Sequence, residues 1–391
     1  MTTQRVYLDW NATTPLRPEA KVAMQAAFEL AGNPSSIHAE GRAARGMIEQ
    51  ARAAVANAIG AAPRDVVFTS GGTEAITLAL TPGVRIGSQP VERLLVSAIE
   101  HAAVLSGGRF AHAQVEVVDV TPEGVVDLDH LRRLLDGGPP ALVSLMLANN
   151  ETGALQPIGE AAEIVHAAGG LLHVDAIQAL GKISFHIKGL GADLMSLSAH
   201  KIGGPKGVGA MVLGSELQGL EPLLRGGGQE LGRRAGTENV AGIVGFGAAV
   251  SAAMPTMGED MARIKKLRDR LEKGLRQTEG SRGGVVVAES VARLPNTTLF
   301  AVPGLRAETA VIGFDLAGIA VSSGSACSSG KVQPSHVLQA MGFGPELAQS
   351  AIRISLGWSS SESDIEACLN AWKRLAGNLT KRDHETVPER F

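Results

Sequence analysis

The chain has 391 residues, and 45% of them are hydrophobic. This length exceeds what one hydrophobic core usually organises, so two domains are expected. Its 36 basic and 39 acidic residues give a formal net charge of −3 without a long run of either sign, which argues against binding to nucleic acid or to an anionic membrane surface. The longest uncharged apolar run, residues 240–254, is shorter than the roughly 18 residues that span a bilayer, and it is expected to form a buried helix.

The first residues, MTTQRVYLDW, have neither the apolar core of a signal peptide nor the arginine-rich pattern of a transit peptide. We therefore expect a cytoplasmic protein, in which two cysteines do not predict a disulfide. Cys368 lies at helical spacing with Ile365 and Trp372, which predicts a role in core packing. Cys327 lies in a serine and glycine run that cannot build a core, so its thiol is expected to be accessible.

Short β-branched runs alternate with helical patterns through the first two thirds of the chain. The strands are predicted at residues 65–70, 93–98, 141–146, 171–176, 194–199 and 209–214. Helical segments such as residues 158–168 separate several of them, which predicts an α/β fold with a mostly parallel sheet. Ligands of such sheets bind at the carboxyl ends of the strands.

A charged amphipathic helix follows the break at Pro255 and is expected to turn Ile264, Leu267, Leu271 and Leu275 inward. Strand and helix patterns beyond it describe a smaller α+β domain, at residues 296–302, 308–317, 351–357 and in a final helix. We therefore expect a large domain of residues 13–254 and a small domain built from residues 1–12 and 255–391.

Polar residues follow the predicted strands. The stretch TSGGTEAI sets two glycines and Thr73 at the start of a helix, which is typical of a phosphate site. Asp175 ends a strand, with Gln178 three residues on, and helix capping is the alternative interpretation of this carboxylate. His101 follows another strand, where a structural histidine is also common. Lys201 ends an apolar run before a glycine-rich turn, where desolvating its ammonium is costly.

Together these residues indicate one ligand, pyridoxal 5′-phosphate (PLP). Its phosphate suits the turn at Thr73, its ring nitrogen needs a carboxylate such as Asp175, and its aldehyde needs a lysine such as Lys201, whose pKa desolvation would depress. Lys206, in a Pro-Gly turn, is expected to face solvent. The pattern predicts no metal site.

Ten motifs in order over nearly the whole chain resemble those of the cysteine desulfurases: YLDWNATTP (7–15), GNPSSIH (32–38), TSGGTEA (69–75), EH (100–101), NNETG (149–153), HVDAIQ (173–178), SLSAHKIGGPKG (196–207), RRAGTEN (233–239), SSGSACSSG (322–330) and IRISLG (352–357). The resemblance implies the aspartate-aminotransferase-like fold (fold type I) of PLP enzymes. This fold has a large domain with a mostly parallel seven-stranded sheet and forms homodimers with active sites at the subunit interface.

The resemblance also implies roles for individual residues. Lys201 bonds to the cofactor aldehyde, His101 stacks on the ring and moves protons, and Cys327 is the catalytic nucleophile. The implied cofactor-binding residues are Gly72, Thr73, Asp175 for the ring nitrogen, Gln178 for the ring hydroxyl, Ser198, His200, and Thr237 reaching over from the partner subunit. The implied substrate-binding residues are Asn11, Asn150 and Arg353, of which the last two hold the substrate carboxylate.

The implied reaction removes sulfur from L-cysteine, leaves L-alanine and forms a persulfide on Cys327, whose long loop would carry sulfur to a scaffold protein for iron–sulfur clusters. Two residues depart from the family pattern: Leu231 stands where related proteins often carry an arginine, and Ser328 stands where threonine is common. The loop around Cys327 resembles the branch with nitrogenase-linked and housekeeping enzymes, and RRAGTEN resembles the nitrogenase-linked type.

Two alternatives stay open. The chain could be a related PLP lyase or transaminase acting on selenocysteine, cysteine sulfinate or another amino acid, for which Cys327 would be dispensable. It could also be a sulfur-relay or regulatory binding protein without turnover, although such a protein has no need of Lys201 and Asp175.

Overall fold

A seven-stranded sheet forms the centre of the larger unit in the computed structural model, which describes residues 5–85, 89–214, 217–278, 283–324 and 334–385. Across the sheet the strands follow the order β2 (Val66–Thr69), β8 (Gly209–Leu213), β7 (Leu194–Ser198), β6 (Leu171–Asp175), β5 (Ala141–Met146), β3 (Arg93–Ser97) and β4 (Val115–Val118). β8 runs antiparallel to both of its neighbours, and the pairings among the strands from β7 to β4 are parallel. The predicted α/β fold with a mostly parallel sheet is confirmed.

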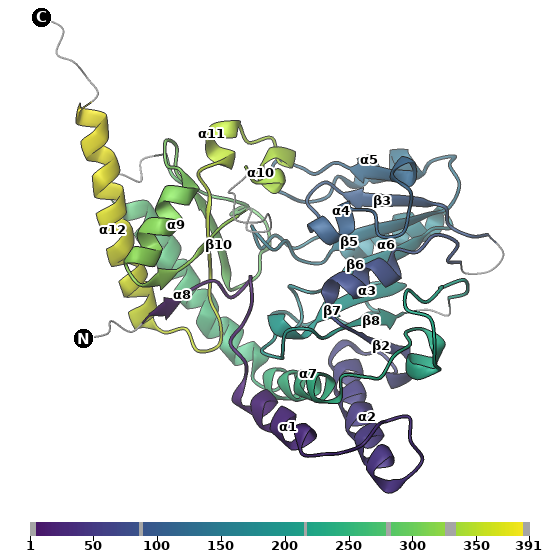
Figure 1. Ribbon diagram of the computed structural model, residues 1–391. Coiled ribbons are helices and arrows are strands. Elements are labelled where there is room, and N and C mark those ends of the chain that lie inside the picture. Colours follow the sequence, from purple (N-terminus) through teal and green to yellow (C-terminus); the bar gives the residue numbers. More distant parts are fainter. Residues whose placement is uncertain (1–4, 86–88, 215–216, 279–282, 325–333, 386–391) are drawn as a thin grey trace, which may run out of the picture.

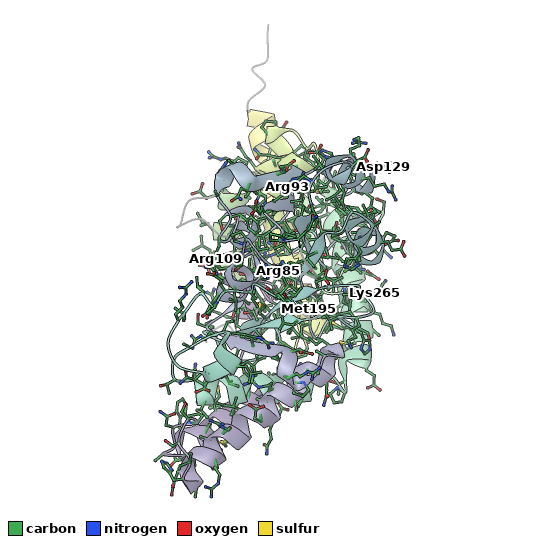
Figure 2. The ribbon with its side chains drawn as sticks, turned by 90° about the vertical axis from the view of Figure 1, so that its right-hand side faces the viewer. Arg85, Arg93, Arg109, Asp129, Met195 and Lys265 are labelled. Carbon is green, nitrogen blue, oxygen red and sulfur yellow. The ribbon has the colours of Figure 1, made fainter. Side chains whose placement is uncertain are left out.

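Helices cover both faces of this sheet because its strands are apolar on both sides. Along β6, Leu172 and Val174 belong to one core cluster and Leu171 to the other, as alternation along a strand requires. The first cluster includes residues of α1 (Pro18–Phe28), α2 (Ala39–Ile59), α5 (Leu128–Leu135), α6 (Ile158–Ala167) and α7 (Val240–Ala253). The second includes residues of α3 (Gly72–Ala79) and α4 (Ala102–Leu105). Met195 of β7 is fully buried and lies in the middle of the molecule (Figure 2).

The smaller unit lies beside the large sheet, and both ends of the chain lie on its side of the molecule (Figure 1). Its antiparallel sheet has the order β12 (Ser322–Ser323), β13 (Ile352–Ser355), β10 (Thr297–Ala301) and β9 (Val285–Val286), while β1 (Val6–Tyr7) pairs with β11 (Ile319–Ala320). Its helices are α8 (Met257–Gln277), α9 (Ala307–Leu316), α10 (His336–Ala340), α11 (Pro345–Ala348) and α12 (Glu362–Glu385).

The long helix α8 leads from α7 into the smaller unit. Its four predicted inward residues, Ile264, Leu267, Leu271 and Leu275, are all buried, and so are Cys368 and Trp372 of α12. The domain boundaries at residues 12 and 254 stay a prediction. No single described helix is long and apolar enough to cross a bilayer; α7 and α8, bent by 75° at their junction, meet the length and composition criteria only as a pair.

A buried ion pair holds the segment before α7 against the sheet. Arg52 of α2 donates two hydrogen bonds to the Glu230 carboxylate, at 2.7 and 2.8 Å, and the same carboxylate accepts the N–H of Phe68 at 2.9 Å. Glu230 and Leu231 both have left-handed backbone angles, with φ of 49° and 56°. Such angles are unfavourable for residues with a side chain, so the ion pair must stabilise this turn. In this conformation the side chain of Leu231 is 73% exposed.

We expect Arg52→Met to destabilise the fold by about 3–5 kcal/mol, because it leaves the Glu230 carboxylate buried without its cation. The double variant Arg52→Met/Glu230→Met removes both charges and is expected to recover most of this loss. Urea unfolding of the three proteins measures the difference, and a double variant no more stable than Arg52→Met would contradict the explanation.

Candidate functional site

The carboxyl ends of the central strands meet at a cavity of about 360 Å³, a volume typical of small-molecule sites. β6 ends at Asp175, β7 ends at Ser198, and a short 3-10 turn, Ala199–Lys201, follows β7 directly. Eleven of the thirteen predicted site residues line this cavity: Asn11, Gly72, Thr73, His101, Asn150, Asp175, Gln178, Ser198, His200, Lys201 and Arg353. Residues distant in sequence are thus brought together where the parallel sheet was expected to bind its ligand.

Lys201 extends from the end of β7 toward the N-terminal segment of the chain. Its Nζ donates hydrogen bonds to the backbone oxygens of Asn11 and of Ala12, the latter at 2.8 Å. These two hydrogen bonds hold the amino group of Lys201 in the cavity.

Helix α3 presents its first turn to the cavity. It begins at Gly72 after Gly71, which supplies no side-chain cap, so the helix start offers N–H groups to a ligand. A Cβ on Gly72 would lie 2.4 Å from Cδ1 of Ile177, so a larger residue here would displace the Ile177 side chain. Nδ1 of His200 lies 3.1 Å from the Thr13 hydroxyl, and burial, with the nearby lysines, lowers the pKa of His200 to about 4. The imidazole is therefore neutral.

Asp175 is the carboxylate at the floor of the cavity. Its Oδ1 accepts the N–H of Ile177 at 2.9 Å, and burial raises its pKa to about 6, although that hydrogen bond and Lys201 act in the opposite direction.

Glu100 lies nearby with 0% exposure, and its Oε1 accepts the N–H of Met146 at 2.7 Å. Burial and then the charge of Asp175 raise the pKa of Glu100 well above its usual value, which favours its protonated form.

His101 caps α4 through its ring. Its Nδ1 accepts the N–H of Ala103 at 3.1 Å, so in the neutral imidazole the proton is on Nε2. Burial, followed by the charges of Lys201 and His336, lowers the pKa of His101. A neutral ring with a defined tautomer can stack on a planar ligand and exchange a proton at Nε2.

Arg353 and Asn150 lie at the opening toward the small unit. Arg353 donates from Nη1 to the backbone oxygen of Asn150 at 3.1 Å and from Nη2 to Asp9 Oδ1 at 2.9 Å. Its Nε is buried and has no hydrogen-bond partner among the residues that the structure describes. The guanidinium therefore keeps N–H groups for an anionic ligand, although Asp9 already engages part of the fork.

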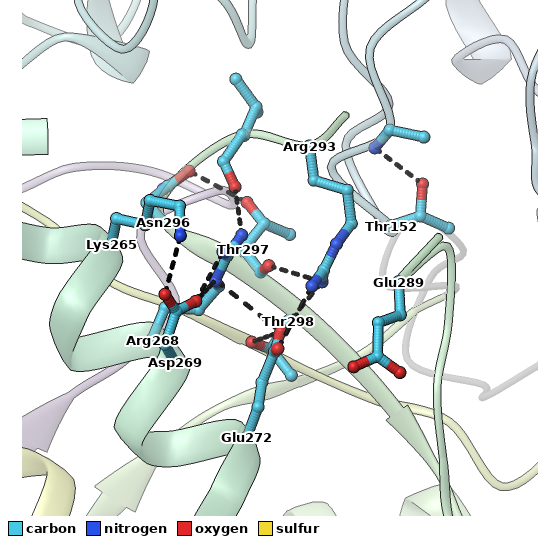
Figure 3. A network of polar contacts seen from close by, with 12 residues as sticks. Thr152, Lys265, Arg268, Asp269, Glu272, Glu289, Arg293, Asn296, Thr297 and Thr298 are labelled. Atoms are coloured by element: carbon cyan, nitrogen blue, oxygen red, sulfur yellow. Dashed lines mark hydrogen bonds and ion pairs between the residues drawn. The ribbon is translucent and has the colours of Figure 1, made fainter. Parts of the chain in front are cut away.

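Asn11 connects the cavity to the smaller unit. Its Nδ2 donates to the Thr297 hydroxyl at 2.9 Å, and its Oδ1 accepts from Asn296 at 3.1 Å. Figure 3 shows the polar network beyond these residues, in which Glu272 of α8 accepts hydrogen bonds from Arg293 and Thr298. The segment that accepts the Lys201 hydrogen bonds is therefore held by Asn296 and β10, and Glu272 of α8 in turn holds β10 through Thr298.

Of the two remaining predicted residues, only Thr237 lies in the described part of the chain, and it does not line the cavity. Thr237 lies exposed before α7, and Cys327 lies outside the described residues, as does Ser328. Sequence reasoning missed Lys182, whose Nζ donates to Gln178 Oε1 at 2.7 Å. The lysine four residues after Gln178 was the available signal, but only the fold shows that it is buried.

Glu151 was also missed as an ionisable group of the NNETG turn. It is 2% exposed, and its Oε2 accepts from the Ser335 hydroxyl at 2.6 Å. Burial raises its pKa to about 7, because the Ser335 hydrogen bond and the charge of Arg353 offset only part of the desolvation.

The chain matches the family model for class-V aminotransferases over residues 6–368. It is 45% identical to a cysteine desulfurase of Cereibacter sphaeroides, over 96% of this chain and 97% of that protein. It is 40% identical to "Cysteine desulfurase IscS" of Dictyoglomus turgidum, over 96% and 95% of the two chains. Among solved structures it is similar to a NifS-like protein from Rickettsia africae, with a TM-score of 0.86 and 39% identity over 96% of this chain and 100% of that chain.

We expect Glu151→Gln to change how stability depends on pH. The pKa of Glu151 is higher in the folded chain than in the unfolded chain, so the wild type loses stability as pH rises from about 4.5 to about 7. Glutamine does not ionise, so the variant escapes a loss on the order of 3 kcal/mol. Urea unfolding at pH 5 and pH 8 measures the free energy of unfolding of both proteins. The value for the variant minus the value for the wild type should be larger at pH 8 than at pH 5, and a difference that does not change with pH would contradict the shifted pKa.

Proposed function

We propose that this protein delivers sulfur from L-cysteine to a scaffold protein for iron–sulfur clusters. The chain belongs to the class-V aminotransferase family and, within it, to the PLP-dependent cysteine desulfurases. The observation that carries the proposal is that Lys201 shares one cavity with Asp175, His101 and the uncapped start of α3. We further propose that the enzyme is a cytoplasmic homodimer.

The chemistry of the cavity fits PLP. The N–H groups at the start of α3, with the Thr73 and Ser198 hydroxyls, suit its phosphate, and Asp175 suits its ring nitrogen. Lys201 supplies the amine for its aldehyde, and Gln178 supplies an amide for its ring hydroxyl. When bound, PLP acts as an electron sink for the amino acid substrate.

The residues of this chain then divide the work. With cofactor and substrate bound, the amino group of Lys201 would act as the base that takes the substrate α-proton. Asp175 carries the negative charge that keeps a proton on the ring nitrogen, since its pKa of about 6 leaves it ionised at neutral pH. His101 exchanges a proton at Nε2, and the buried N–H groups of Arg353 bind the substrate carboxylate.

Cys327 is proposed to accept the sulfur. Its thiolate attacks the substrate sulfur, so a sulfur–sulfur bond forms while the carbon–sulfur bond breaks. The electron pair of the broken bond stays on the substrate carbon, which takes a proton to become the methyl group of alanine, and the enzyme keeps a persulfide. Thr237 is proposed to reach the phosphate of the partner subunit, which agrees with its exposure in a single chain.

The names of the relatives and the motif RRAGTEN favour different scaffold proteins. The relatives include proteins named IscS and NifS-like, and RRAGTEN alone favours a nitrogenase-linked acceptor. We therefore propose a general iron–sulfur scaffold, and a competition between it and a nitrogenase-cluster scaffold for radiolabelled persulfide sulfur tests this choice. Preferential transfer to the nitrogenase-cluster scaffold would contradict it.

We expect the purified holoenzyme, given L-cysteine without a thiol reductant, to release about one alanine per protomer and then stall, because the persulfide occupies Cys327. Cys327→Ala should release none, and reductant should restart only the wild type. Amino acid analysis of the supernatant measures alanine. Continuous and equal release of alanine or pyruvate by both proteins would instead indicate a lyase or transaminase.

We expect Lys201→Ala to lose the covalent attachment of the cofactor that borohydride reduction produces in the wild-type chain, because the amine that bonds to the aldehyde is removed. Absorption spectra and mass analysis of the reduced protein measure this. A wild-type protein that stays colourless after PLP supplementation would favour the non-catalytic alternative.

A further inference from the structure

Lys182 is a buried lysine whose hydrogen bonds go to neutral amide oxygens. It lies four residues after Gln178, in the turn that follows β6, and is 7% exposed. Its Nζ donates to Gln178 Oε1 at 2.7 Å and, at a long distance of 3.5 Å, to Asn11 Oδ1. The charges that act on it are those of Lys201 and Arg353, which are both cations. A lysine in such surroundings is expensive to bury, so its position needs a reason other than charge pairing.

The contacts of Gln178 define which way its amide faces. Oε1 accepts from Lys182, while Nε2 donates to the backbone oxygen of Asn11 at 2.9 Å. Turning the amide over would set Nε2 against the Lys182 donor and Oε1 against the Asn11 acceptor, and both hydrogen bonds would be lost. Nε2 carries a second N–H, which the contact with Asn11 leaves for the cavity that Gln178 lines.

We propose that Lys182 is a positioning residue that fixes the Gln178 amide so that an N–H, and not the carbonyl oxygen, is presented to the ring hydroxyl of the cofactor. The inference rests on the proposed contact between Gln178 and that hydroxyl. It deepens the proposed function by naming the group that orients this contact.

This role needs hydrogen-bond donors rather than a charge. Burial, and then the charges of Lys201 and Arg353, lower the pKa of Lys182 well below its usual value, so the side chain loses its proton readily. An ammonium and a neutral amine both carry enough N–H groups for the two contacts, so the orientation of Gln178 persists in either state. Lys182 in turn contributes to the lowered pKa of His200, which is lowered chiefly by burial.

The test is a pH titration of the visible absorbance of the bound cofactor in the purified holoenzyme. An N–H donor favours the deprotonated form of the ring oxygen, so its loss raises the pH midpoint of the absorbance change. We expect Lys182→Met, which conserves volume, to raise the midpoint by about one unit, since a hydrogen bond to a charged group is worth roughly one such unit or more. Gln178→Leu should raise it similarly.

The double variant separates positioning from other effects. If Lys182 acts through Gln178, Lys182→Met should add no further shift in the Gln178→Leu background. Lys206→Met is the matched control, because Lys206 is exposed and its charge acts on His200, but it does not contact Gln178. The midpoint of the Lys206→Met variant should equal that of the wild type. A shift that persists in full without Gln178, or a Lys182→Met midpoint equal to the wild type, would overturn the inference.

If Lys182→Met does not fold, Lys182→Gln provides the test, because it removes the charge but keeps an N–H donor toward Gln178. We expect its midpoint to lie closer to the wild type than that of Gln178→Leu, and a shift as large as that of Gln178→Leu would contradict the proposal. A wild-type protein without a titrating visible band would instead contradict the assignment of the cofactor, so the two failures are distinguishable.

Discussion

The site depends on one constraint, the burial of the polar groups of Asn11. Its N–H donates to the Ser355 hydroxyl at 2.9 Å, its side chain bonds to Asn296 and Thr297, and its backbone oxygen accepts from Gln178 and Lys201. With 1% exposure, none of these groups can turn to water instead. Because both units supply partners, a shift of β10 or β13 would move the oxygen that holds Lys201. The geometry of the reactive amine is thus set by the small unit as much as by the large sheet.

Desolvation sets the protonation states around the cavity. Burial is the largest cause of the altered pKa values of Asp175, His101 and His200, and neighbouring charges adjust them further. The histidines consequently stay neutral beside a lysine, while Asp175 keeps an ionised form at neutral pH. His101 accepts the N–H of Ala103 at Nδ1, so the proton of its neutral ring is on Nε2. The same burial that stabilises the fold therefore assigns acid and base roles.

The sequence predicted those parts of the site that local patterns determine. Asp175 and Lys201 could be placed because each follows an apolar run that reads as a strand, and parallel strands end at one edge. The edge strand β4 was not identified, since Val115–Val118 includes Glu116 and leaves Val117 49% exposed, unlike the continuous apolar runs of the central strands.

Lys182 and Glu100 could not be predicted for a different reason. Neither lies in a pattern that distinguishes a buried charged group from one on the surface, because their burial depends on contacts with distant segments. Arg353 was expected to hold a substrate carboxylate, and nothing in the sequence indicated that its Nη2 also donates to Asp9, which a strand bridge pairs with Ser355.

The cations of the cavity suggest how binding and protonation are linked. Lys182, Lys201 and Arg353 lie close enough for the charges of Lys201 and Arg353 to lower the pKa of Lys182. A ligand that brings a phosphate and a carboxylate offsets this repulsion, so it raises the affinity of the cluster for protons. By linkage, protons held by the cluster in turn strengthen the binding of the anionic groups. In a chain with a net charge of −3, basic side chains thus lie in and beside the cavity whose proposed ligands are anionic.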